Sequence, residues 1–200
     1  SLTYTIVANL GVGEGSVANN SDGTFTFDPG ADFQDLAVGE SRDVTFTYKA
    51  TDSQATDSMV DATVTITVTG VNDLPIAVGD LRTVDQNVVT NEAAAGVLAN
   101  DVDADVSDIL TVTKLGAENL VAGTFTTVTN RGASLTLNDD GSFTYDPTTS
   151  AELIALDVGD SVDDGVQYTI TDPHGQTSTA TLIFTVNGVN DAPVAVDDSY

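Results

Sequence analysis

A phrase of six residues occurs twice in this chain and divides it into repeats. Residues 70–75 read GVNDLP and residues 188–193 read GVNDAP, so Asn190 follows Asn72 by 118 residues (190 − 72). Phe25 and Phe143 have the same spacing (143 − 25), inside the shared pattern Asp-Gly-(Thr/Ser)-Phe-Thr-(Phe/Tyr)-Asp-Pro. Two different motifs recur at the same spacing, and 118 residues is a common length for one domain. The chain is therefore built by internal duplication.

Alternation of apolar and polar residues between turn signals predicts strands along most of the chain. The clearest strand is 62–69, where Val64, Ile66 and Val68 alternate with threonines. Asp-Gly pairs at residues 22–23 and 140–141 predict tight hairpins, because glycine accepts the positive φ angle that such turns need. The other predicted strands are 2–8, 24–27, 43–49, 82–89, 110–115, 123–128, 134–137, 142–145, 166–171 and 180–186, with short helical turns at 91–98 and 149–156.

Short strands without the spacing of β-α-β units predict an all-β chain of tandem Greek-key β-sandwiches, of cadherin or immunoglobulin-like type. We expect domains at residues 1–75, 76–193 and 194–200. The first should lack its opening strand and acidic loop, and the last matches residues 76–82 and should open a third repeat. We expect a monomer, although these two ends leave open a head-to-tail pairing of chains by strand addition.

The charge of the chain excludes several classes of partner. It has 31 acidic and 5 basic residues and a formal net charge of −26, which disfavours nucleic acid and anionic membranes. No run of 18 apolar residues is present, so we expect no membrane insertion. With no cysteine there is neither a disulfide nor a thiolate site, and a divalent cation is the economical way to neutralise the acidic excess.

One acidic turn has the chemistry of a calcium site. Residues 100–105 read NDVDAD, which places carboxylates at Asp101, Asp103 and Asp105. Oxygen donors of this kind suit Ca²⁺. An EF-hand loop counted from Asp101 would need glycine at its sixth position and glutamate at its twelfth, where this chain has Val106 and Val112.

Taken together, these motifs resemble the tandem cadherin-like, or VCBS-type, repeats of large bacterial surface adhesins of the RTX kind. The shared motifs are the Gly-Val-Asn-Asp-x-Pro linker, the Asp-Gly hairpin, the Tyr-x-x-Thr-Asp phrase at residues 48–52 and 168–172, and the Asn-Asp-x-Asp-x-Asp turn. The resemblance covers essentially the whole chain. It implies a Ca²⁺-stiffened stalk outside the cell, at the bacterial surface, exported by a type I system, whose partners are the neighbouring repeats of the same polypeptide.

The resemblance also implies which residues bind Ca²⁺. In cadherin-type linkers the ligands come from the base of one domain, the linker and two loops of the next domain. Asp80 is a further candidate ligand. Asp160 can join Asn190 and Asp191 in a second, following site. Carried onto this sequence, the metal ligands are Glu40, Asn72, Asp73, Asp101, Asp103, Asp105, Asp172, Asn190 and Asp191.

The sequence does not favour catalysis. His174 is the only histidine and lies in an Asp-Pro-His-Gly turn, and no Gly-x-Ser-x-Gly motif occurs. Among 31 acidic residues, paired carboxylates are expected by chance. The alternative function is a binding module that holds surface glycans or proteins through its exposed acidic loops, although no aromatic cluster suited to stacking on a sugar is evident.

Overall fold

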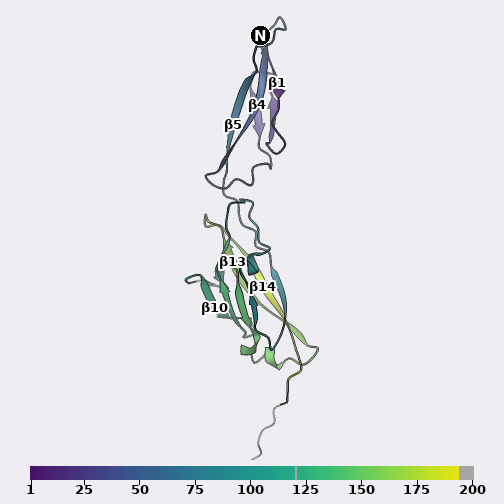
Figure 1. Cartoon of the computed structure of the whole chain (residues 1–200), viewed down its shortest axis with the longest axis vertical. Coiled ribbons are helices and arrows are strands. Elements are labelled where there is room, and N and C mark those ends of the chain that lie inside the picture. Colours follow the sequence, from purple (N-terminus) through teal and green to yellow (C-terminus); the bar gives the residue numbers. More distant parts are fainter. Residues whose placement is uncertain (120, 194–200) are drawn as a thin grey trace, which may run out of the picture. The chain divides into compact units, whose positions relative to one another are not determined.

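The structure of the chain is a computed structural model that describes residues 1–119 and 121–193. The chain contains two compact units, one made of Ser1–Asp73 with Ala104–Asp108, the other of Leu74–Asp103 with the residues from Ile109 onward (Figure 1). Each unit has its own sheets. Residues 194–200, expected to open a third repeat, lie outside the described residues.

The first unit is built from a three-stranded sheet and a separate hairpin. The sheet has the order β1-β4-β5, with β1 (Thr3–Ala8), β4 (Ser41–Thr51) and β5 (Ala62–Thr69). The hairpin joins β2 (Ser16–Asn19) to β3 (Phe25–Asp28). All pairs are antiparallel, and the alternation of valine or isoleucine with threonine along β5 gives that strand one inward and one exposed face.

The core of the first unit is small. Phe33, Leu36 and Val44 form its buried cluster, and Leu10, Phe27, Ile66 and Val68 pack against them while remaining partly exposed. Full burial of one large apolar side chain contributes about 1.5–3 kcal/mol, so partial exposure of several of them leaves this unit with modest hydrophobic stabilisation.

The second unit is a β-sandwich of two larger sheets. One has the order β6-β14-β13-β8-β9 and the other β10-β11-β12-β7. Single turns of 3-10 helix lie in the connections. Those at Gly96–Leu98 and Leu153–Ala155 fall within the two segments where the sequence predicted helical turns, whereas the turn at Pro147–Thr149 shares only Thr149 with the second segment. The bounds are β6 (Asp80–Asp85), β7 (Thr90–Glu92), η1 (Gly96–Leu98), β8 (Thr111–Leu115), β9 (Glu118–Asn119), β10 (Thr124–Val128), β11 (Ser134–Asn138), β12 (Phe143–Asp146), η2 (Pro147–Thr149), η3 (Leu153–Ala155), β13 (Ser161–Thr171) and β14 (Thr177–Asn187).

Side chains from both sheets of the second unit meet in one core. Leu182, Phe184 and Val186 of β14 are fully buried, as are Phe143 and Tyr145 of β12. The rings of Tyr145 and Phe184 stack with centroids 3.7 Å apart, which joins the two sheets. The expectation of an all-β chain of β-sandwich type is therefore confirmed.

The two Asp-Gly turns have the predicted backbone. Gly23 has a φ angle of 95° and Gly141 one of 81°. Each preceding aspartate accepts a backbone hydrogen bond from the residue after the glycine, with 2.9 Å both from Thr24 N to Asp22 Oδ1 and from Ser142 N to Asp140 Oδ1. The Asp-Gly motif thus specifies the hairpin in both repeats.

One strand pair of the second unit is parallel, whereas the strands of a Greek-key β-sandwich are typically antiparallel. Strand β14 pairs with β6 in parallel, from Leu182 opposite Asp80 to Asn187 opposite Asp85. Since β6 and β14 are not consecutive in the chain, no hairpin forces them to run in opposite directions.

Several strands also differ from the predictions in their bounds, and some were not predicted. The strand expected at residues 82–89 ends at Asp85, because Val88 N donates to Asp85 O in a turn. Strand β13 begins at Ser161, five residues before the predicted 166–171 (166 − 161), through a stretch whose two aspartates and glycine read as a loop. Strands β2, β7 and β9 were not predicted, and β7 overlaps the start of the helical turn that was expected at 91–98.

Candidate metal centre

The acidic turn begins from a pinned backbone. Ile76 and Val102 exchange both backbone hydrogen bonds, at 2.8 and 3.1 Å, and Asp101 Oδ1 accepts a further bond of 2.7 Å from Val78 N. These contacts tie the start of the turn to the segment that follows Pro75. The positions of the next carboxylates are therefore set by β-type pairing.

Three carboxylates come together from this turn and from the end of β13. Ligand oxygens of Asp103, Asp108 and Asp172 all lie within 4.8 Å of one another. Asp172 is buried and the other two are half-buried. Asp172 Oδ1 accepts hydrogen bonds from His174 N at 2.9 Å and Gln176 N at 2.8 Å, which orients this carboxylate from its own turn.

Asp105 holds the linker phrase. It is fully buried, and its Oδ2 accepts a 2.8 Å hydrogen bond from the backbone N–H of Asp73. Asp108 N donates to Asp105 O at 2.9 Å, which closes the turn that carries Asp108. Asn72 Nδ2 donates to Asp73 O at 2.6 Å, so the linker amide is fixed as well.

The glycine of the linker phrase is required by close packing. A Cβ on Gly70 would lie 2.1 Å from Leu36 O, and one on Gly188 would lie 2.0 Å from Asp157 O. Real Cβ atoms do not approach a carbonyl oxygen so closely. In both repeats, the end of the last strand therefore lies against the turn before β4 or β13.

Asp80 and Asp101 meet a buried tyrosine. The hydroxyl of Tyr168 lies 2.9 Å from Asp80 Oδ2 and 3.5 Å from both Asp101 carboxylate oxygens. Burial raises the pKa of both carboxyls, and Asp101 also has the negative charge of Asp80 nearby. Arg82 Nη1 lies 3.5 Å from Asp80 Oδ1. Asp80, a further candidate ligand, is thus held by contacts with Tyr168 and Arg82 inside the second unit.

Glu40 lies in a turn of the first unit. Its side chain is exposed, and Ala37 N donates to Glu40 Oε2 at 3.1 Å while Gly70 N donates to Glu40 O at 3.0 Å. The group of three carboxylates found among the described residues does not include it. The carboxylate of Glu40 therefore caps its own turn.

Asn190 and Asp191 follow β14 and are exposed. Asp191 Oδ2 lies 3.4 Å from Nε2 of Gln86, a side chain that is only 1% exposed. Gln86 Nε2 also lies 3.3 Å from Ile154 O, and Gln86 Oε1 is buried without a hydrogen-bond partner among the described residues. Gln86, which sequence reasoning missed, therefore carries a buried amide whose nitrogen contacts Asp191.

Asp108 is the other residue that sequence reasoning missed. The search for ligands followed the alternation through Asp101, Asp103 and Asp105, and Asp108 lies outside that pattern. It reaches the cluster because the chain turns between Asp105 and Asp108. Three acids at alternate positions with a fourth three residues later is the sequence signal that could have identified it.

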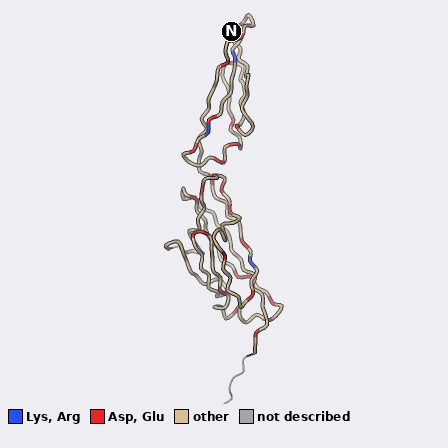
Figure 2. The backbone as a smooth tube through the Cα atoms, in the orientation of Figure 1, with Lys and Arg blue, Asp and Glu red and all other residues tan. Residues whose placement is uncertain are grey.

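The donor set fits a hard divalent cation. Every charged donor is a carboxylate, the neutral donors are amide oxygens, and the chain has no cysteine. Figure 2 shows acidic residues distributed through both units, with few basic ones among them. Since nearby carboxylates with restricted solvation repel one another, a bound cation of charge two would reduce this repulsion.

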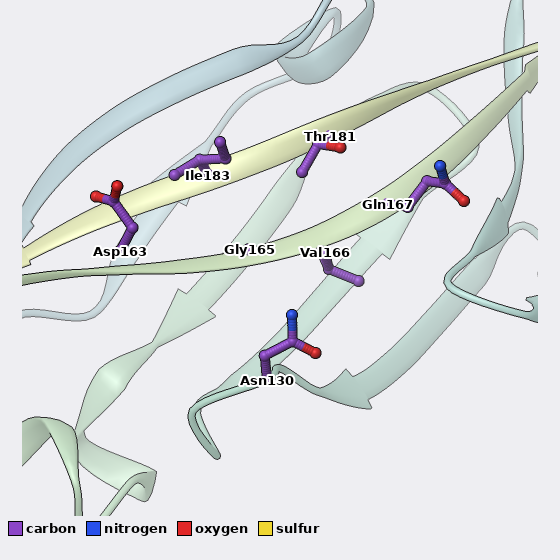
Figure 3. A pocket seen from close by; sticks show the side chains of 7 residues that line it. All are labelled: Asn130, Asp163, Gly165, Val166, Gln167, Thr181 and Ile183. Carbon is purple, nitrogen blue, oxygen red and sulfur yellow. The ribbon is translucent and has the colours of Figure 1, made fainter.

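A shallow pocket of the second unit has different chemistry. It has a volume of about 340 Å³ and lies over β13 and β14 where Gly165 has no side chain (Figure 3). The described residues that line it include no aromatic ring for a sugar to stack on. The lining residues are Asn130, Asp163, Gly165, Val166, Gln167, Thr181 and Ile183.

Comparison with known proteins gives two family matches. Residues 72–188 match the bacterial cadherin-like domain and residues 2–69 match the cadherin-like domain. A comparison with curated proteins finds no match. Among the residues that the structure describes, no helix has the length and apolar character needed to cross a membrane.

Several solved structures are similar to the chain. Human mucin-like protocadherin EC1-2 gives a TM-score of 0.51 at 15% identity, over 94% of this chain and 85% of that one. Human CDH23 EC21-23 gives 0.48 at 14% identity, over 92% and 58%. Mouse protocadherin-24 EC1-3 gives 0.45 at 14% identity, over 94% and 58%. At these identities the first likeness bears on the fold alone, and the other two are too weak to carry an argument.

Proposed function

Because the chain belongs to the family of bacterial cadherin-like domains, we propose that it is a non-catalytic, Ca²⁺-binding extender module of a bacterial cell-surface adhesin. Cadherin-like domains are extracellular modules that occur in tandem arrays and generally bind Ca²⁺. The observation that carries the proposal is the convergence of Asp103, Asp108 and Asp172 within 4.8 Å.

The cation ligands proposed here form two groups. The first contains Asn72, Asp73, Asp101, Asp103, Asp105, Asp108 and Asp172, with Glu40 as an outlying member. The second contains Asn190 and Asp191, to which we add Gln86 because its buried Oε1 lies on the side chain that contacts Asp191. Their oxygen-only chemistry and the hydrogen bond from Asp73 to Asp105 support the first group.

Calcium at the first group stiffens the linker between repeats. We take the repeats to be residues 1–75 and 76–193, as the 118-residue periodicity indicates. A cation held by linker residues and loop carboxylates together adds ionic bonds that a free linker lacks. The result is an extender whose linker is flexible at low Ca²⁺ and becomes rigid at the higher Ca²⁺ concentration outside the cell.

The parent protein that we propose is an adhesin of the RTX kind, exported by a type I system. The recurring GVNDxP linker, the Asp-Gly hairpin and the acidic turn support this assignment. Calcium sites in extracellular modules typically bind at about 10⁻⁴–10⁻³ M. Such sites remain empty in cytosol and fill after export, which agrees with folding of the stalk outside the cell.

The experiment is a calcium titration followed by calorimetry and thermal unfolding. We expect saturable Ca²⁺ binding, a higher unfolding temperature in Ca²⁺ than in EDTA, and a stiffer particle by small-angle scattering. The double variant Asp103→Asn, Asp108→Asn should abolish most of the shift, whereas Asp61→Asn, at an exposed position, should not. No heat of binding together with identical melts in Ca²⁺ and EDTA would refute the proposal.

A glycan-binding module is the alternative function. It predicts saturable binding of a glycan at the exposed acidic loops, and a glycan array without hits would count against it. The pocket over Gly165 does not favour it, because the lining residues offer polar groups without a ring.

A further inference from the structure

The outermost strand of the four-stranded sheet in the second unit has an open edge. Among residues 1–119 and 121–193, strand β10 (Thr124–Val128) pairs with β11 and with no other strand (Figure 1). It lies in the middle of its repeat, between β6 and β14. A strand edge of this kind presents backbone N–H and C=O groups with which another chain can pair.

The hydrogen bonds at the two ends of β10 show which of its backbone groups face β11. At one end, Asp139 N donates to Gly123 O at 2.8 Å. At the other end, Thr129 N donates to Ala133 O, also at 2.8 Å. The register between β10 and β11 is continuous, and backbone groups alternate in direction along an antiparallel strand. The odd positions from 123 to 129 therefore face β11, and the even positions face the open side.

Two residues remain free on the open side. Thr124 is already occupied there, because it exchanges both backbone hydrogen bonds with Val121, at 3.3 and 3.4 Å. Thr126 and Val128 have no backbone partner on that side among the described residues, and the one side-chain contact is 3.5 Å long, from Thr127 Oγ1 to Val128 O. The free stretch of the edge is therefore short and has a defined direction.

The other sheet edges of the second unit are protected, as far as the described strands show. Strand β6 carries three charged side chains, and β7 and β9 have only three and two residues. Charge and short length are common means by which edge strands avoid other chains. In contrast, residues 119–130 contain no charged side chain, and Val121 and Val128 are 75% and 68% exposed. The edge of β10 thus lacks this protection.

The first repeat has no counterpart of β10. Thr3 and Thr111 are equivalent, because each pairs with the threonine of its own Tyr-x-x-Thr-Asp phrase, and they lie 108 residues apart (111 − 3). Strands β2 and β11 begin 118 residues apart (134 − 16). The second repeat therefore has ten additional residues in between (118 − 108), and β10 lies in this longer connection. The fold shared by the repeats does not require such a strand, which favours a role in contacts.

We propose that β10 is a site of lateral association, where it pairs antiparallel with β10 of a second copy of the chain about a two-fold axis at Thr127. In this register Thr126 exchanges both backbone hydrogen bonds with Val128 of the second copy, and Val128 does so with its Thr126. The two free residues satisfy each other, so one surface serves both chains. The two copies of Thr127 face each other as a pair without mutual backbone hydrogen bonds.

Charge favours a second copy as the partner at this edge. Each chain has a formal net charge of −26, so two chains repel each other over most of their surfaces. They can approach closely where a strand has no charged side chain. One contact of this length is weak, but several such contacts along two arrays of repeats add up through multivalency. The pairing holds neighbouring chains side by side and does not involve the candidate metal centre.

The test traps the pair with a disulfide in the whole chain, which has no cysteine of its own. Facing residues of this kind have Cα atoms about 4.5 Å apart, within the range of about 4.4–6.8 Å that a disulfide spans. We expect Thr127→Cys to form a covalent dimer about tenfold faster than Thr83→Cys, because pairing raises the effective concentration of the thiol. Thr83 is the matched control, since it is exposed on the edge strand β6 while Thr127 is half-buried. Oxidation in EDTA and high salt excludes calcium and screens the repulsion between chains.

A second variant tests the backbone pairing itself. Val128→Pro, added to Thr127→Cys, removes the N–H that faces the open side and leaves the bonds to β11, since edge strands tolerate proline at such positions. We expect cross-linking to fall to the rate of Thr83→Cys, whereas Val128→Thr, which keeps the N–H, should leave it unchanged. The unfolding temperature of each variant checks that the second unit is folded.

Two results would overturn the proposal. Equal rates for Thr127→Cys and Thr83→Cys, the outcome if the edge serves a different protein or none, would refute it. Cross-linking of a folded Val128→Pro variant at the undiminished rate would show that the edge is not paired in this way.

Discussion

The backbone N–H of Asp73 donates to the carboxylate of Asp105 at 2.8 Å, across 32 positions of sequence. This bond connects the repeated linker phrase to the acidic turn. The turn is therefore part of the fold of the linker even before any cation is considered. A charged acceptor on a partly buried N–H is a stronger bond than a neutral one.

Replacement of Asp105 by alanine should destabilise the chain. The change removes a charge-assisted hydrogen bond from Asp73 N and leaves a partly buried donor, which costs about 1.5–3 kcal/mol. Equilibrium unfolding in urea, carried out in EDTA, measures the loss without a contribution from calcium. Asp61→Ala is the control, because Asp61 is exposed. Equal stability of the two variants would contradict the role given to Asp105.

Salt should partly replace calcium as a stabiliser. The chain has a formal net charge of −26, and the Debye length falls from about 10 Å at 0.1 M salt to about 3 Å at 1 M. We expect the unfolding temperature in EDTA to rise with NaCl, while the further rise caused by Ca²⁺ becomes smaller. Scanning calorimetry at both ionic strengths tests this. A calcium effect that is independent of salt would show that relief of repulsion is not its source.

Acidification should stabilise the second unit through Asp80. Burial raises the pKa of this carboxyl above its ordinary value of 3.8. The stabilising contribution of its protonation is therefore fully present below pH 3.8 and is lost as the pH rises through the raised pKa. In Asp80→Asn the amide oxygen can still accept a hydrogen bond from the Tyr168 hydroxyl. The stability of this variant relative to wild type should therefore increase as the pH rises from about 4 to about 7. Urea unfolding in EDTA at both pH values measures the difference, and a relative stability that falls with pH would contradict it.

Tyr145→Phe should weaken a buried polar group in the second unit. Asp164 is fully buried, and its Oδ2 accepts hydrogen bonds from Tyr145 OH at 2.9 Å and Thr129 Oγ1 at 2.5 Å. Loss of the tyrosine bond should cost about 1.5–3 kcal/mol because the acceptor is a carboxylate. Phe27→Leu, at the equivalent position of the first unit, is not expected to cost more than about 1.5 kcal/mol. Thermal unfolding followed by tyrosine fluorescence measures the loss of stability in each variant. A loss for Tyr145→Phe no larger than that for Phe27→Leu would contradict this role of the tyrosine hydroxyl.

The sequence predicted much of the fold, for a physical reason that the strands illustrate. Strand β5 was predicted with the bounds that it has, since alternation of valine and threonine is a local signal. The first half of β13 was not, because Asp164 lies in the core through bonds to Thr129 and Tyr145 that are distant in sequence. Tertiary partners, which no local pattern reports, make a strand of that stretch.

The candidate metal centre was predictable to a similar extent. Asp103 and Asp172 were expected to meet, and they do so in one cluster. Asp108 was missed because a turn, and not alternation, brings it to the cluster. Gln86 was missed because the search considered the acidic residues, of which the chain has 31, and not single amides. Glu40 was expected among the ligands, and its carboxylate caps the turn at Ala37.

The parallel pairing of β6 with β14 sets how the second unit carries load. Within the described residues these are the first and last strands of the unit, and they lie side by side over six residue pairs, from Asp80 with Leu182 to Asp85 with Asn187. Tension applied at the two ends of this unit would pull β6 backward and β14 forward along their common axis. All the ladder bonds would then be strained together in shear, instead of opening one after another as in a hairpin pulled from its open end. The topology makes the unit a mechanical clamp.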